Sequence, residues 1–133
     1  MEVKKSRTAV YHTNYHIVFC PKYRHRVFED ERADYLKDLF QRLIEKRGWE
    51  AVAIEVRPDH VHLFVRGIEP QVSLSGVVKY LKGVSGISLF KKYPELREKF
   101  RKGRLWSKSY YVGTAGEVSS EVIKRYIERV EHE

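Results

Sequence analysis

The chain has 133 residues, 42% of them hydrophobic and 33% charged, which suffices for one modest core in a single domain spanning residues 1–133. The sequence contains no run of 18 or more apolar residues, which excludes a predicted membrane-spanning helix. Residues 1–7 lack the apolar segment of a signal peptide, and Cys20 is the single cysteine, so we expect no intramolecular disulfide. These features predict a cytoplasmic protein.

The charge balance favours a polyanionic partner. Lys and Arg number 26 against 18 acidic residues, which gives a net charge of +8. A basic domain with 13% aromatic residues is typical of nucleic-acid binding, because cations neutralise phosphates and aromatic rings stack on unpaired bases. A generic basic surface explains the same composition equally well.

The first predicted elements are a strand and a helix. Residues 11–20 are rich in β-forming side chains and end at Pro21, which indicates a strand. Asp30 can cap a helix that Gly48 ends. The apolar residues between them have the i, i+3, i+4 spacing of one buried helical face, and they are Leu36, Leu39, Phe40, Leu43 and Ile44.

A hairpin is predicted next. Residues 50–56 form its first strand, with Val52, Ile54 and Val56 on one face. The tight connection at 57–59 leads to a strand over 60–66. Side chains alternate along a strand, so Val61, Leu63 and Val65 are expected to face a core. The opposite face then carries His60, His62, Phe64 and Arg66.

A second helix follows, and we expect Ser73 to cap it. Its inward residues are Leu74, Val77, Val78 and Leu81. Gly83 and Gly86 weaken its continuation, and the helix must end before Pro94. Residues 95–107 read as a basic loop or short helix.

The last elements are a strand and a helix. Residues 110–112 predict a fourth strand. A final helix begins near Ser119 or Ser120, and we expect it to span about 118–131 and to be mobile, docking on a dimer partner. Its apolar stripe is formed by Val122, Ile123, Tyr126, Ile127 and Val130.

The predicted order βαββαβ, followed by a helix, is that of an α+β, ferredoxin-like or RRM-like sandwich with an antiparallel sheet. The first and third strands lie side by side at its centre, and helices cover one face. His60 and His62 then lie on the open face, beside the strand that carries His16. Such open sheet faces read single strands in RNA-recognition folds.

His60 and His62 form the clearest chemical motif. One strand face brings their imidazoles together, close enough to hold one metal ion. A pair of surface histidines on a half-exposed strand explains the spacing as well.

Tyr126 is the candidate nucleophile, because it lies among basic residues on the last helix and tyrosine can form covalent intermediates. Simple packing on the helix stripe is its other interpretation. Two histidines, a metal ion and a tyrosine together suggest attack on a scissile phosphate, with the phosphodiester energy kept in a phosphotyrosine link. Rejoining then needs no nucleotide cofactor.

Five short blocks occur in order along the chain. They are Tyr15-His16-Ile17-Val18-Phe19 with Lys22-Tyr23-Arg24, Pro58-Asp59-His60-Val61-His62-Leu63, Leu81-Lys82-Gly83 with Ser85, Leu105-Trp106-Ser107 with Ser109-Tyr110-Tyr111-Val112, and Val122-Ile123-Lys124-Arg125-Tyr126-Ile127-Glu128. Together they resemble the single-tyrosine HUH transposases of the smallest bacterial and archaeal insertion sequences, including relatives of the REP-associated tyrosine transposases. The resemblance covers about residues 11–129.

The resemblance implies a metal-dependent homodimer that recognises hairpins at the ends of an insertion sequence and cuts single-stranded DNA. Cleavage leaves a 5′-phosphotyrosine and a free 3′-OH, and rejoining excises or inserts the element. By position, His60 and His62 would hold Mg²⁺ or Mn²⁺ and Tyr126 would be the nucleophile. The tyrosine helix of one subunit can complete the site of the other.

One position departs from the family pattern. Relatives often carry a glutamine four residues after the tyrosine as a third metal ligand, where this chain has Val130. Glu128, Glu131 and Asp59 are oxygen donors nearby in the sequence, but the motif assigns none of them. The third ligand therefore stays open, and a decayed, DNA-binding relative remains an alternative.

The candidate DNA contacts combine phosphate-neutralising charge with stacking surface. They are Lys22, Tyr23, Arg24, Lys82, Arg104, Trp106 and Lys108. A solvated basic surface is the alternative for the cations, and anchoring of loops to the core is the alternative for Tyr23 and Trp106.

Three functions remain open from the sequence. The first is the strand-transfer enzyme. The second is a non-catalytic binder of single-stranded nucleic acid that uses the same sheet and needs no metal. The third is a nuclease that hydrolyses DNA or RNA through a metal-bound water and leaves no protein–DNA adduct.

Overall fold

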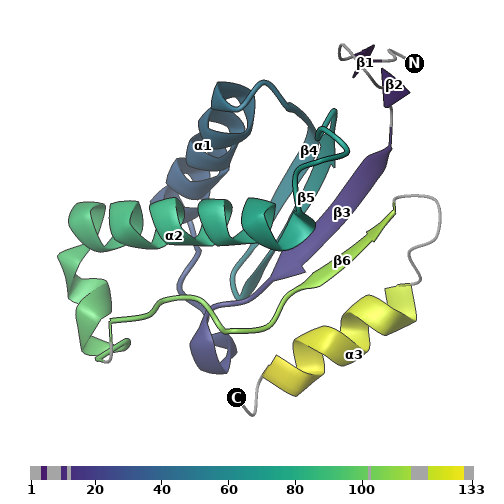
Figure 1. Ribbon diagram of the computed structural model, residues 1–133. Coiled ribbons are helices and arrows are strands. Elements are labelled where there is room, and N and C mark those ends of the chain that lie inside the picture. Colours follow the sequence, from purple (N-terminus) through teal and green to yellow (C-terminus); the bar gives the residue numbers. More distant parts are fainter. Residues whose placement is uncertain (1–3, 6–9, 12, 102, 115–119, 131–133) are drawn as a thin grey trace.

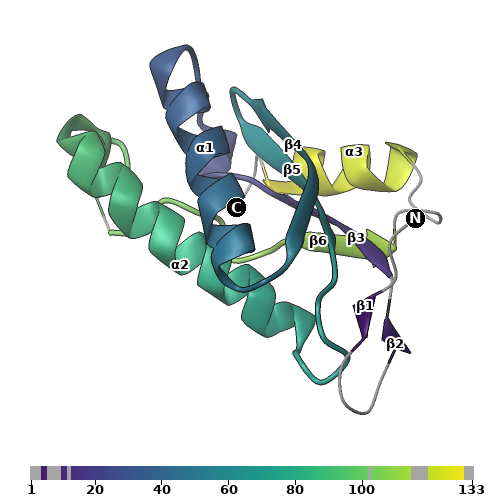
Figure 2. The same ribbon diagram turned by 90° about the horizontal axis from the view of Figure 1, so that it is seen from above.

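The computed structural model describes residues 4–5, 10–11, 13–101, 103–114 and 120–130, and it has helices on both faces of an antiparallel sheet (Figures 1 and 2). The sheet order is β4-β5-β3-β6, and its strands are β3 (Asn14–Phe19), β4 (Glu50–Arg57), β5 (His60–Arg66) and β6 (Tyr111–Thr114). The helices are α1 (Glu31–Lys46), α2 (Leu74–Lys92) and α3 (Ser120–Val130), with 3₁₀ turns η1 (Lys22–Arg24) and η2 (Pro94–Glu98). Two short strands near the N-terminus, β1 (Lys4–Lys5) and β2 (Val10–Tyr11), pair with each other and were not predicted.

The predicted fold class and strand arrangement are confirmed. The first and third predicted strands, β3 and β5, pair antiparallel at the centre of the sheet. Val61, Leu63 and Val65 are fully buried, while the residues between them are half-buried. This alternation places the two histidines of β5 on the face away from α1 and α2. Within the described part of the chain, none of the helices has the length and hydropathy of a bilayer-spanning helix.

Helices α1 and α2 cover one face of the sheet and enclose the larger core. The five apolar residues predicted for the buried face of α1 are all buried. Ser73 caps α2 as expected, because its Oγ accepts a hydrogen bond from the Gly76 N–H at 3.1 Å. Asp30 is the N-cap residue of α1, as predicted, but its side chain makes no capping bond; its backbone carbonyl accepts from the N–H of Ala33 and Asp34.

Two further expectations are corrected by tertiary packing. Val52 was predicted to share one face with Ile54 and Val56, but it is half exposed while Ile54 is buried, because the pairing of β4 with β5 shifts register between Ala51 and Ala53. Such a bulge changes the face that the following side chains take. Gly83 and Gly86 do not interrupt α2, since core contacts of its flanking apolar residues outweigh the low helix propensity of glycine.

Helix α3 lies on the opposite face of the sheet from α1 and α2 (Figure 2). A second apolar cluster joins it to β3 and consists of Val18, Cys20, Ile123, Tyr126 and Val130. The face that the sequence left open is therefore partly covered by the chain's own last helix. The expectation that this helix is mobile and docks on a partner stays a prediction, and positions 118, 119 and 131 lie outside the described residues.

Candidate active site

The histidine face is the sheet surface that carries His16, His60 and His62. The rings of His60 and His62 lie with centroids 4.8 Å apart and are inclined at 73°. Both come from β5, whose alternating pattern turns them to the same side. His16 is on the neighbouring strand β3 and stacks on Phe64 at a centroid distance of 4.0 Å. The sequence thus placed the histidine pair correctly.

Asp59 fixes the ring of His60. This carboxylate is buried at the turn between β4 and β5, and its Oδ1 lies 2.7 Å from His60 Nδ1. Its other oxygen, Oδ2, lies 2.9 Å from Nε of Arg24. With Nδ1–H donated to Asp59, His60 can offer the Nε2 lone pair to a metal ion. Carboxylates often orient metal-binding histidines in this way.

His62 has a different partner, because its Nδ1 lies 2.9 Å from Nε2 of His16. A metal-binding Nε2 on His62 requires the proton on Nδ1, so His62 would donate to His16 in that tautomer. Burial, reinforced by the positive charge that His60 and His16 can carry, lowers the pKa of His62 from 6.5 to about 4. Burial also lowers the pKa of His16. Both rings are therefore neutral near pH 7.

These lowered pKa values predict a pH dependence of stability. Between pH 6.5 and about 4 the unfolded chain protonates His62 while the folded protein does not, so the free energy of unfolding should decrease as the pH falls through this window. Urea denaturation at pH 7 and pH 5, with a chelator present, measures the decrease. We expect His62→Gln to show a smaller decrease than the parent; an equal decrease in both would contradict the lowered pKa.

His60 and His62 supply only some of the ligands that a metal ion needs. Two oriented imidazoles suit Mn²⁺ better than Mg²⁺, which prefers oxygen ligands. Among the described residues no group of three or more His, Cys, Asp or Glu is placed to hold a metal ion. Val130 is fully buried in the apolar cluster, Glu128 is exposed, and Glu131 lies outside the described residues. Oxygen atoms of water or of a bound phosphate would have to complete the coordination.

Tyr126 lies on the same sheet face as the histidines. It packs in one cluster with Val18, and Val18 is the direct cross-strand neighbour of His62. The Tyr126 side chain is buried, and its hydroxyl donates a hydrogen bond to the carbonyl of Ser109 at 3.0 Å. The sequence suggested two roles for Tyr126, packing and nucleophilic attack. Both are possible only if the hydroxyl can break its hydrogen bond to the Ser109 carbonyl.

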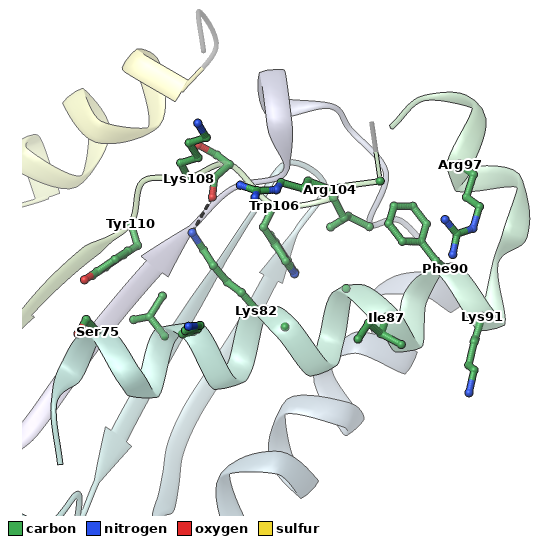
Figure 3. Close-up of a pocket in the computed structure, with 17 residues that line it drawn as sticks. Ser75, Lys82, Ile87, Phe90, Lys91, Arg97, Arg104, Trp106, Lys108 and Tyr110 are labelled. Carbon is green, nitrogen blue, oxygen red and sulfur yellow. Dashed lines mark hydrogen bonds between the residues drawn. The ribbon is translucent and has the colours of Figure 1, made fainter. Parts of the chain in front are cut away.

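A basic groove of about 610 Å³ lies on the other side of the sheet, between α2 and residues 103–110 (Figure 3). Its described lining contains no acidic residue, and the cations are Lys79, Lys82, Lys91, Arg97, Arg104 and Lys108. Arg104 and Lys108 are exposed. Lys82 instead donates to the carbonyls of Ser107 and Ser109 at 2.6 and 2.9 Å, which fixes this segment over α2. The groove thus gathers several of the predicted DNA contacts.

Trp106 also lines this groove but is largely buried, and Lys22 and Tyr23 lie elsewhere. Trp106 is 6% exposed, packs edge-on against Phe19 at 4.7 Å, and donates its indole N–H to Ser85 at 3.0 Å. This placement favours a role as core anchor. Lys22 and Tyr23 lie in η1, where Tyr23 is 54% exposed and can present a ring to a base.

Some residues of the site were not predicted in their observed roles. Asp59, His16 and the carbonyl of Ser109 contact His60, His62 and Tyr126 respectively. Cross-strand register could have suggested His16, since His16 and His62 lie within two positions of each other across the central strand pair. A turn carboxylate and a loop carbonyl give no periodic signal.

A family model described as IS200-like transposase matches residues 9–130. The chain therefore belongs to the IS200-like transposase family.

Its relatives cover most of the chain. The ISDra2 transposase TnpA of Deinococcus radiodurans is 43% identical over 128 residues, which is 96% of this chain and 91% of the relative. The transposase for insertion sequence element IS200 of Salmonella typhimurium is 33% identical over 108 residues, which is 81% of this chain and 70% of the relative.

Two solved structures resemble the fold. A crystal structure of a Deinococcus radiodurans R1 protein described as a transposase superposes with a TM-score of 0.87 at 42% identity, covering 96% of this chain and 97% of the other. The REP-associated tyrosine transposase bound to a REP hairpin has a TM-score of 0.54 at 11% identity, covering 98% and 70%, and this likeness shows the fold alone.

Proposed function

We propose that the protein is a metal-dependent transposase that cleaves and rejoins single-stranded DNA at insertion-sequence ends through a 5′-phosphotyrosine at Tyr126. The observation that carries this proposal is the histidine face, where the imidazoles of His60 and His62 each use Nδ1 for a protein partner and share their sheet side with the tyrosine helix. A metal-dependent covalent adduct on a denaturing gel tests it.

The chain's own residues have distinct roles in this reaction. His60 and His62 would hold Mg²⁺ or Mn²⁺ through Nε2, and the bound ion would supply positive charge for the developing oxyanion. The phenolic oxygen of Tyr126 forms a bond to phosphorus while the bond from phosphorus to the 3′ oxygen breaks. The phenolic proton is released, and the 3′ oxygen leaves as a hydroxyl. Attack by a 3′-OH in the reverse direction rejoins the strands and frees Tyr126.

Access of the nucleophile is the main structural requirement. Tyr126 donates its hydroxyl to Ser109 and is buried, so a phosphate can reach it only after α3 shifts from this position. A homodimer offers one route, since β6 is an edge strand to which a second copy could pair and exchange α3. One tyrosine per chain holds one cleaved end, so two subunits suit the exchange of two strands.

The DNA partner is inferred from charge and from the chain's membership of a transposase family, and a protein of similar fold has been solved with DNA. That protein is a transposase bound to a REP hairpin. The acid-free lining of the basic groove suits a phosphate backbone, and Arg104 and Lys108 are exposed along it. We propose that a hairpin end or its single-stranded flank follows this groove.

Replacing both Arg104 and Lys108 by glutamine should weaken DNA binding about tenfold at low salt, because each cation is expected to contribute roughly 0.7 kcal/mol to the binding free energy. The slope of log affinity against log salt should fall by roughly 0.7 for each single-strand phosphate that the variant no longer neutralises. Fluorescence anisotropy at several salt concentrations measures both quantities. The matched control is Lys37→Gln with Arg42→Gln, which removes the same charge from the exposed side of α1. Equal weakening in both double variants would contradict a specific role of the groove in binding.

A non-catalytic binder of single-stranded DNA is the second candidate, and the buried, hydrogen-bonded Tyr126 and the apolar Val130 favour it. That function predicts tight binding that needs neither metal nor Tyr126.

A further inference from the structure

The turn η1 holds a backbone conformation that side chains rarely adopt. Tyr23 and Arg24 follow one another at φ values of 56° and 54°, in the left-handed region that favours glycine. Neither position is a glycine. Two consecutive residues persist there only where surrounding contacts fix them, and such backbone outliers often mark functional sites.

The contacts of Arg24 explain what this turn positions. Its Nε forms the 2.9 Å ion pair with Asp59, and the two side chains are 26% and 11% exposed. Its Nη1 donates to the carbonyl of Ile127 at 3.5 Å, a weaker contact than the ion pair. One guanidinium therefore joins a β4–β5 turn carboxylate to the helix residue next to Tyr126.

Asp59 cannot hold His60 in one orientation unless the carboxylate is itself fixed. Its Oδ1 faces His60 and its Oδ2 faces Arg24, so the guanidinium sets the rotation of the carboxylate group. A planar, charged fork suits this task better than the flexible amine of lysine. Hydrogen-bond partners behind the metal-binding histidines orient the imidazole rings and raise the affinity of the site for the metal ion.

We propose that Arg24 is a positioning residue that locks the His60 ring through Asp59 and ties this pair to the helix bearing Tyr126. The inference rests on the proposed metal site at His60 and His62. It assigns Arg24 a role distinct from the phosphate contact expected from sequence. In the folded protein this guanidinium is engaged inside the site, rather than along the basic groove.

The two roles of Arg24 are separated by measuring metal binding without DNA and DNA binding without metal. The variants are Arg24→Gln and Arg24→Lys. The control is Arg26→Gln, which removes one positive charge at a position two residues after Arg24. The Arg26 side chain is exposed and pairs only loosely with Glu29, at 3.6 Å. Titration with Mn²⁺ alone, followed by electron paramagnetic resonance, gives the metal affinity. Circular dichroism confirms that each variant is folded, and hydrogen exchange reports on α3.

The inference predicts that Arg24→Gln weakens Mn²⁺ binding about tenfold and speeds hydrogen exchange in α3, while Arg24→Lys recovers part of the affinity. Metal-free DNA affinity of Arg24→Gln should match that of Arg26→Gln. Unchanged Mn²⁺ affinity with weakened metal-free DNA binding would overturn the inference and assign Arg24 to phosphate contact. A parent protein that binds no Mn²⁺ would overturn the metal site of the proposed function and this inference with it.

Discussion

Tyr126→Phe is expected to reduce the covalent protein–DNA adduct by at least about 10³-fold, because phenylalanine has no oxygen to attack phosphorus. Binding of the same DNA should stay within about twofold of the parent, since the ring still fills its place in the α3 cluster. The missing hydrogen bond to the Ser109 carbonyl should cost only about 1 kcal/mol of folding stability. Adduct yield on a denaturing gel, beside anisotropy measurements of binding, separates chemistry from affinity.

Tyr111→Phe is the matched control for this experiment. Tyr111 is a partly buried tyrosine packed against the same cluster, on β6 rather than on α3. It should retain the parent's adduct yield. If Tyr126→Phe formed adduct normally, or if Tyr111→Phe lost it equally, the assignment of the nucleophile would be wrong.

His60→Ala and His62→Ala should each lower metal-dependent cleavage by at least about 10²-fold, since charge stabilisation by a bound metal is worth several kcal/mol. Mn²⁺ affinity should fall together with cleavage, and metal-free DNA binding should change little. His62→Ala should also leave His16 without its 2.9 Å partner. Mn²⁺ titration and single-turnover cleavage at several metal concentrations measure these effects.

His25→Ala provides the comparison for the two histidine variants. His25 lies after η1 and packs edge-on against Phe100, away from the histidine face. It should bind Mn²⁺ like the parent. Metal-dependent cleavage that survives in both His60→Ala and His62→Ala would show that the histidine pair is a surface feature, as the alternative interpretation of the motif holds.

The main sheet and the three α-helices could be predicted from sequence because their signals are periodic. Alternation in β5 and the apolar stripe of α1 each reflect one buried face. Val52 could not be placed, since the bulge that exposes it depends on pairing with β5. The side-chain cap at Asp30 did not form, and the φ of 51° at this residue departs from the extended conformation that capping residues usually adopt.

The candidate site, too, could be predicted from the sequence only in part. His60 and His62 share a face by strand geometry alone, so their motif was readable. Their direct partners are His16 on β3 and Asp59 in the β4–β5 turn, and Asp59 is itself paired with Arg24 from a left-handed turn. Sequence favoured Arg24 and Trp106 as DNA contacts because charge and aromaticity are visible, whereas the ion pair and the burial that engage them arise only on folding.

The most direct test of the proposed chemistry is peptide mapping of a covalent adduct. The parent protein is incubated with single-stranded DNA from the ends of its own insertion sequence and Mn²⁺, then digested and analysed by mass spectrometry. We expect a metal-dependent adduct with a nucleotide 5′-phosphate on Tyr126. Shortened DNA without any adduct, as a hydrolytic nuclease would give, or an adduct on another residue, would contradict it.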